Sequence, residues 1–287
     1  MKKTKIIILI LITFSIAFSF TPTVTPQVGT YTFHGAAGNI KTLKVRTADN
    51  SSLEDLFGAS YNSTMEGFFG VGCLIEGAQK KSLVTAVNFS AKFDPSTQIF
   101  PVFGLGLLDI TQYNTSNWDW TTGSFNATPD SIGDMVESFY DPINLTTYIN
   151  TLYNTYFFTP YNISTHTAGA YLAQLPTSVA QYLGALVWEP RWENVGNTIV
   201  HNALAGSFIF GTTVQYLENC TETWTYDATY GAWIGYKIQD NETNTIYEFS
   251  IELPTGAEIP GFELPVLLGA SMGMMVVLIF VIMKKRK

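Results

Sequence analysis

The sequence predicts an α+β domain built on an antiparallel β-sheet, strongly curved in one alternative, with a helical block inserted at about residues 130–205. Three observations predict this fold class. Segments with two-residue alternation, such as Tyr247 to Leu253, occupy both flanks of the domain and are typical of half-buried strands. Helical spacing of apolar residues occupies the middle. Strands, then helices, then a strand meander form the order expected of an antiparallel sheet covered by helices.

The first part of the domain is expected to form strands and one short helix. Residues 30–33 and 40–46 flank a connection at 34–38 that is typical of a hairpin. Ser51 and Glu54 have the spacing of a capping box, which predicts a short helix. From Leu83 to Phe93 apolar and polar residues alternate, and this places Asn88 on the more polar face of a strand.

The middle of the chain is expected to be helical. Apolar spacing predicts helices at 145–156, after a cap at Asn144, and at 179–187, with shorter helices at 132–139 and 192–203. Strands return from about residue 207, and the segments 227–231 and 240–243 are expected to be tight turns between them.

Charge is divided sharply along the chain. The two ends, residues 1–5 and 284–287, hold seven of the 15 bases, which leaves eight bases beside all 23 acids in the interior. The interior charge is therefore −15 (8 − 23). A domain this acidic repels phosphate backbones, so no nucleic acid is expected as a partner.

Both ends have patterns that target a membrane. Residues 1–20 join a basic start to a short apolar run and lead into a proline-rich exit, which predicts a cleaved signal peptide, with an uncleaved anchor as the alternative. Residues 264–283 carry no charge and precede a basic cluster, which predicts a transmembrane helix whose basic end is cytoplasmic. The expected organisation is a signal peptide at 1–20, an extracytoplasmic domain at 21–258, a transmembrane anchor at 259–283 and a cytoplasmic basic tail at 284–287. This describes a single-pass type I protein of the plasma membrane, with its domain facing the cell exterior.

Residues 259–287 carry a resemblance to known proteins. Pro260, Gly261 and Phe262 precede the apolar span and the final Lys/Arg cluster. This order resembles the three-part C-terminal signals of archaeal surface proteins, and in one such family the Pro-Gly-Phe tripeptide is recognised by a membrane-embedded archaeosortase. The resemblance implies an archaeal secreted or cell-surface protein of unassigned function with a C-terminal sorting or anchor tail. The Thr-rich linker that other members carry upstream is absent here.

Sequons and cysteines also fit an extracellular domain. Asn-x-Ser/Thr occurs more often than the composition produces by chance, and every copy lies between the predicted signal and the predicted span, so N-glycosylation of several sites is expected. The candidates are Asn50, Asn62, Asn88, Asn114, Asn126, Asn144, Asn162, Asn219 and Asn241. Cys73 and Cys220 are the only cysteines, and their exterior location predicts one disulfide, with two separate buried thiols as the alternative.

Motifs for chemistry are scarce. His34, His166 and His201 lack the spacing of metal ligands, and His201 is expected on a solvated helical face. Trp118, Asp119 and Trp120 place an acid between two aromatic rings, which suits contact with a sugar, although a packed turn is the alternative. No catalytic residue, cofactor or metal is therefore expected, and the protein is not expected to be an enzyme.

Three classes of function remain. A non-catalytic structural, adhesion or recognition role at the cell surface is favoured by the anchor, the sequons and the lack of a reactive cluster. The first alternative is an extracytoplasmic carrier or sensor of an apolar ligand, because a curved sheet packed by helices can enclose a cavity, as the lipoprotein-carrier half-barrels do. The second alternative is a secreted hydrolase acting on carbohydrate. The expected partners are membrane lipid around the span and an extracellular protein, glycan or apolar ligand, and a large apolar cavity would favour the carrier or sensor.

Overall fold

The computed structural model describes residues 31–94, 106–147, 173–186, 188, 190–207 and 214–252. The predicted signal peptide, transmembrane anchor and tail motif lie outside the described residues, as do the sequon at Asn162 and the side chain of His166. Within the described residues, no helix is both long enough and apolar enough to cross a membrane.

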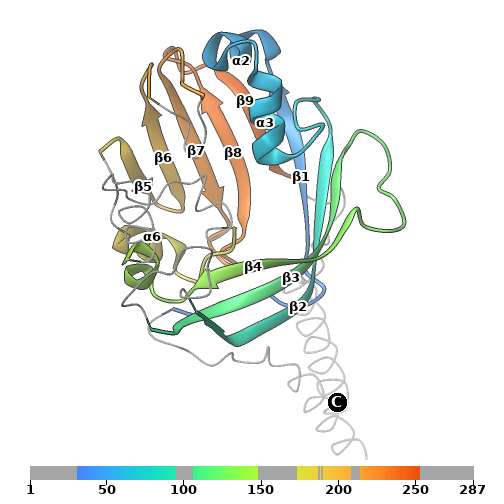
Figure 1. Cartoon of the computed structure of the whole chain (residues 1–287), viewed down its shortest axis with the longest axis vertical. Helices are drawn as coiled ribbons and strands as arrows, with labels where there is room; N and C mark the ends of the chain where they lie inside the picture. The colour runs from blue at the N-terminus through green and yellow to red at the C-terminus, as the bar shows by residue number, and fades with distance from the viewer. Residues whose placement is uncertain are drawn as a thin grey trace, which may run out of the picture.

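Nine strands form one antiparallel sheet in the order β4-β3-β2-β1-β9-β8-β7-β6-β5 (Figure 1). The chain builds the sheet from its centre to one edge with β1 to β4, and then returns from the opposite edge with β5 to β9, so that β9 lies beside β1. The elements are β1 (Ile40–Ala48), α2 (Asn50–Phe57), α3 (Tyr61–Phe69), β2 (Gln79–Phe93), β3 (Leu108–Thr121), β4 (Ser131–Phe139), α6 (Val179–Ala185), β5 (Trp192–Val195), β6 (Thr198–Ala203), β7 (Cys220–Tyr226), β8 (Trp233–Gln239) and β9 (Thr245–Ile251). The prediction of an antiparallel sheet with a few helices is confirmed.

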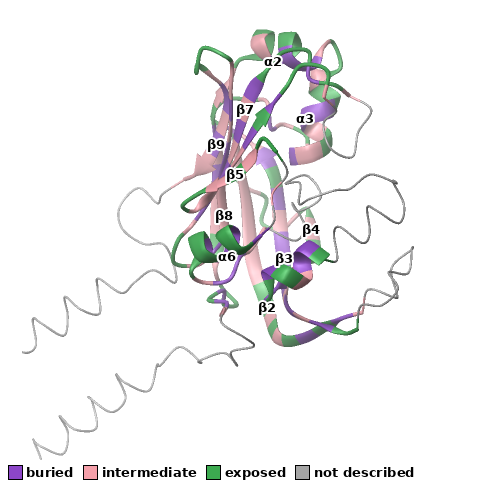
Figure 2. Cartoon of the chain, turned by 90° about the vertical axis from the view of Figure 1, so that its left-hand side faces the viewer, coloured by how far each residue is buried: buried purple, intermediate pink, exposed green. Residues whose placement is uncertain are grey.

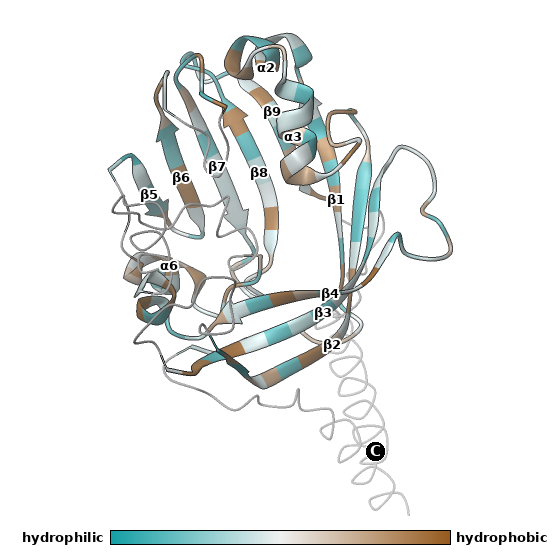
Figure 3. Ribbon diagram, viewed as in Figure 1, coloured by the Kyte–Doolittle hydropathy of each residue, from teal (hydrophilic) through white to brown (hydrophobic). Residues whose placement is uncertain are grey.

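The two faces of the sheet differ in composition. We call the face that carries Trp224, Tyr236 and Phe249 the inner face; these three aromatic side chains are buried and lie beside one another on β7, β8 and β9. The opposite, outer face carries polar residues such as Lys237 and Glu248 at the intervening positions. Figure 3 shows the resulting change between hydrophobic and hydrophilic residues along the strands. This period of two is the pattern that predicted the strands at the C-terminal flank.

The sheet is strongly curved at β2, β3 and β4. The pairing register of β2 with β3 shifts at three places, between Gln79 and Lys81, between Val84 and Ala86, and between Asn88 and Ala91. Such bulges bend a strand and increase its twist. In Figure 1, β4 and the adjoining parts of β2 and β3 therefore run across the ends of the upright strands β6 to β9.

Helices α2 and α3 cover the inner face at one end of the sheet (Figure 1). Asp49 caps α2, because its carboxylate accepts hydrogen bonds from the backbone amides of Ser51 and Ser52 at 3.1 and 3.3 Å. The predicted helix is confirmed, whereas the predicted cap at Ser51 is wrong by two residues. The ring of Phe69, the last residue of α3, packs 4.8 Å from Tyr236 and 5.2 Å from Phe249, between ring centroids.

The predicted helical block at 130–205 is only partly correct. Helix α6 is confirmed, and residues 142–147 are helical, but residues 132–139 and 192–203 form strands rather than helices. Strand β4 holds a bulge at Gly133, and β5 and β6 are joined by the two-residue turn Gly196–Asn197, so in both segments apolar residues fall at helix-like intervals. The predicted N-terminal hairpin is also wrong, because β1 pairs with β2 and β9.

The predicted disulfide between Cys73 and Cys220 is not formed, and both cysteines are free and buried. The carbonyl of Cys73 accepts a hydrogen bond from the Tyr247 hydroxyl of β9 at 2.9 Å, whereas Cys220 begins β7, two strands away. Two strand spacings amount to about 10 Å, and bonded cysteines have Cα atoms within about 7 Å. The alternative of two separate buried thiols holds.

Both thiols are expected to resist alkylation in the folded protein. Burial raises the pKa of the Cys73 thiol to about 11 and raises that of Cys220 as well, so little reactive thiolate exists at about pH 8. Iodoacetamide without reductant should label neither thiol in the native protein and both in urea, as counted by intact mass. Unfolded, unreduced protein that takes up no label would show that a disulfide exists.

Candidate functional site

A cavity of about 450 Å³ lies where the sheet bends. Its walls come from β1, β2, β3, β4, β8 and β9, from the end of α3 and from the segments 35–39, 173–174 and 227–232. Most of the lining is apolar, and its apolar residues include Phe68, Phe69, Val84, Trp120, Trp233, Ile234, Phe249 and Ile251. The volume falls within the range of about 300–1,000 Å³ that is usual for small-molecule sites.

One wall of the cavity is a short segment held across the β7–β8 turn. The amide of Trp233 donates to the carbonyl of Ala173 at 3.0 Å, and the amide of Leu175 donates to the carbonyl of Gly231 at 2.7 Å. Gly231 has a positive φ of 71°, and a Cβ there would overlap the carbonyl of Leu175. Glycine is therefore required for this segment to close against the turn.

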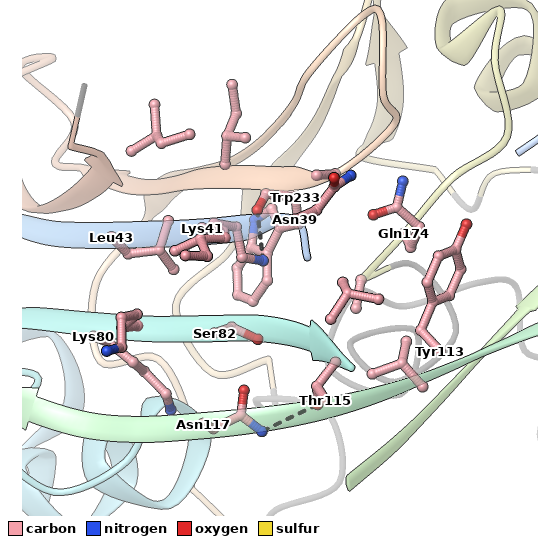
Figure 4. A pocket seen from close by; sticks show the side chains of 18 of the residues that line it. Asn39, Lys41, Leu43, Lys80, Ser82, Tyr113, Thr115, Asn117, Gln174 and Trp233 are labelled. Atoms are coloured by element: carbon pink, nitrogen blue, oxygen red, sulfur yellow. Dashed lines mark hydrogen bonds between the residues drawn. The ribbon is translucent and has the colours of Figure 1, made fainter. Parts of the chain in front are cut away.

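Two lysines bring positive charge to the apolar walls (Figure 4). The Lys41 ammonium donates to the carbonyl of Trp233 at 3.0 Å, and the Lys80 ammonium donates to the carbonyl of Phe69 at 2.9 Å. Neither forms an ion pair with any described residue. Burial, and then the nearby charge of Lys80, lower the pKa of the Lys41 ammonium to about 8. Burial also lowers the pKa of Lys80.

The carboxylates that line the cavity already have hydrogen-bond donors. Asp227 accepts from the amides of Thr229 and Tyr230 at 2.9 and 2.6 Å, which fixes the predicted turn at 227–231. Asp134 accepts from the side-chain amide of Asn117 at 2.6 Å and from the hydroxyl of Ser131. These neutral donors leave both carboxylates charged, so the lining holds three lysines (Lys41, Lys80 and Lys81) and two aspartates, a net formal charge of +1 (3 − 2).

The Trp118–Asp119–Trp120 motif is a packed structure with no open aromatic platform. Trp118 and Trp120 are only 7% and 8% exposed, and their indole N–H groups donate to the carbonyls of Asn126 and Phe69. The ammonium of Lys81 lies 3.5 Å from the centre of the Trp118 ring, where it covers that ring. A polar hollow of about 220 Å³ does lie beside the exposed Asp119, but a sugar has no free indole face to stack on there.

A second cluster of titratable groups surrounds Glu222 of β7. Its buried carboxylate accepts hydrogen bonds from the hydroxyls of Tyr216 and Tyr236 at 2.8 and 2.5 Å and lies 2.8 Å from Nδ1 of His201. The prediction of a solvated helical His201 is wrong, because this residue is a buried member of β6 whose ring stacks on Trp192 at 3.9 Å. His34 is exposed. Nowhere in the described residues do three or more His, Cys, Asp or Glu side chains gather as a metal site would need.

The sequons in the described residues leave the cavity clear. Asn50, Asn62, Asn88, Asn114, Asn126, Asn219 and Asn241 are exposed, whereas Asn144 is partly buried next to the buried Thr146 of its own sequon. None of these asparagines lines the cavity, although Asn126 lines the hollow beside Asp119. Burial along the chain is shown in Figure 2.

Comparisons of the chain with models of protein families, with curated proteins and with solved structures find no significant match. The function of the site is therefore inferred from its geometry. Sequence reasoning missed Lys41 and Lys80, although the charge distribution offered one signal. They are two of only eight bases in an interior of charge −15, and each is the second residue of its strand.

Proposed function

We propose that this protein is a membrane-anchored, non-catalytic surface protein whose domain binds an apolar or amphipathic ligand, as a carrier or sensor. The observation that carries the proposal is the cavity at the bend of the sheet, which is mostly apolar and of ligand size. A cavity of this kind favours the carrier or sensor over a purely structural role, since close packing normally leaves few voids larger than a water molecule.

The predicted anchor keeps this cavity near the membrane. Ile251 lines the cavity, and the described chain ends one residue later at Glu252. The predicted apolar span begins at Leu264, so the intervening chain reaches at most about 40 Å even when fully extended. A molecule that leaves the outer leaflet would therefore have a short path to the cavity.

Photo-crosslinking in a lipid environment tests the proposal. The full chain is placed in phosphatidylcholine nanodiscs with dodecanol that carries a diazirine in its chain, illuminated and mapped by peptide mass spectrometry. We expect labelling of cavity-lining peptides, such as those with Val84 and Ile234, and competition by unlabelled dodecanol. Labelling confined to the predicted span at 264–283, or spread evenly over the outer face of the sheet, would reject the proposal.

A further inference from the structure

We infer that the ligand is an amphiphile with an anionic head group, a carboxylate or a phosphate, which Lys41 and Lys80 bind at the wall of the cavity. This inference rests on the proposed function and names the ligand class for the same site. It follows from the positions of the two ammonium groups, the bonds they make and the charges around them.

The two lysines are placed to hold one group together. Lys41 of β1 lies opposite Ser82 of β2, and Leu43 lies opposite Lys80, so the two lysines are diagonal neighbours on one face of an antiparallel pair. Diagonal neighbours have Cα atoms about 7–8 Å apart, within reach of long side chains. Both residues line the cavity, and Figure 4 shows Lys41 beside Trp233 with Lys80 further along the same wall.

Neither ammonium group forms an ion pair with a described residue, although the charges of Asp119 and Asp134 act on Lys80 and partly offset the lowering of its pKa by burial. Each donates to one backbone carbonyl, and an ammonium has three donors, so donors remain for a ligand. Three of the other six bases of the domain do have acidic partners: Lys44 and Arg46 both pair with Glu252, and Lys92 pairs with Asp109. Charge that is removed from water is costly unless it is paired, and an anionic head group would supply the missing partner.

The cavity wall also disfavours other head groups. The carboxylates of Asp134 and Asp227 each bind two local donors through one oxygen, and the three lysines of the lining outnumber them. A cationic head would in addition lie against two positive charges. A neutral head would leave both ammonium groups unpaired. Of the three classes, only an anionic head group places an opposite charge beside the two ammonium groups.

Competition with the photoreactive dodecanol tests the inference. Dodecanoate, dodecyl phosphate, dodecanol and dodecylamine share one chain length and differ in the head group. With the full chain in the same nanodiscs, we expect at least one of the two anions to displace the probe at a concentration about tenfold lower than dodecanol, with dodecylamine the weakest. Comparing the two anions distinguishes a carboxylate from a phosphate as the head group.

Variants assign the preference to the two lysines. Lys41→Gln keeps a donor for the Trp233 carbonyl but removes the charge, and it should reduce the preference for the anion to about threefold. Adding Lys80→Gln should abolish the preference, and Trp120 still donates to the Phe69 carbonyl in that variant. Lys237→Gln, on the outer face, is the matched control and should keep the full preference.

The outcomes separate the inference from the proposed function. Labelling of the cavity with no preference among head groups, or a preference that survives the double lysine variant, would overturn the inference while leaving the apolar site intact. Stronger competition by dodecylamine would overturn it as well. Absence of any cavity labelling would overturn the proposed function itself.

Discussion

Replacing Glu222 with Ala should lower the free energy of unfolding by about 3–5 kcal/mol. The carboxylate is 1% exposed and accepts the hydroxyls of Tyr216 and Tyr236 while it pairs with His201. Its removal takes one acceptor away from three buried polar groups and opens a void in the inner-face core. Urea unfolding followed by tryptophan fluorescence measures the change.

The matched control for this loss is Glu248→Ala. Glu248 lies on the outer face of β9, where its side chain is only partly buried, and the substitution should change stability by about 0.5 kcal/mol or less. Equal, small losses for the two variants would show that the Glu222 cluster does not stabilise the sheet. Such a result would indicate that the Glu222 cluster has a role other than stabilising the fold.

Ser82→Trp should reduce labelling of the cavity by dodecanol diazirine by at least about tenfold. Ser82 lies on the cavity wall between Lys41 of β1 and Asn117 of β3, so an indole there would fill much of the space that the ligand chain needs. The loss corresponds to about 1.4 kcal/mol or more of binding free energy. Quantitative mass spectrometry of the labelled peptides measures it.

Thr85→Trp is the control for the added indole. Thr85 belongs to the same strand but is exposed and does not line the cavity, so labelling should stay at the level of the unmodified protein. A thermal unfolding curve for each variant shows whether the fold is kept. Unchanged labelling in a folded Ser82→Trp variant would mean that the ligand does not occupy this cavity.

The strands that the sequence predicts well are those with one face in the core. In β9, Tyr247 and Phe249 are buried while Glu248 between them is not, so the two-residue period is visible in the sequence. In β2, Asn88 is exposed as predicted, although the bulges that bend the strand left no clear trace in the pattern. Because the curvature of the sheet depends on those bulges, the sequence predicts strong curvature only as one alternative.

Two segments that the sequence predicts as helices form strands, and the structure explains both errors. Strand β4 is at the sheet edge and is largely exposed, so its pattern is not set by burial, and Gly133 adds a bulge. Between Trp192 and Ala203 the helix-like spacing arises from two short strands. The Gly196–Asn197 pair between them is a turn signal that would have separated the two.

The candidate site could not be predicted in the same way. Its walls come from six strands, a helix end and three loops that are far apart in the chain, and its apolar residues look like ordinary core residues in the sequence. The expectation of a curved sheet packed by helices predicts a cavity only as one alternative. Lys41 and Lys80 can be recognised as a candidate anion-binding pair only once the β1–β2 register places them on one face of the sheet.

Native mass spectrometry of the full chain, purified from the membranes in which it is made, tests the central claim most directly. The account predicts one anionic amphiphile bound to each chain, identifiable after solvent extraction, retained in Thr85→Trp and lost in Ser82→Trp. A chain that carries no amphiphile, or an amphiphile that remains bound in a folded Ser82→Trp variant, would contradict it.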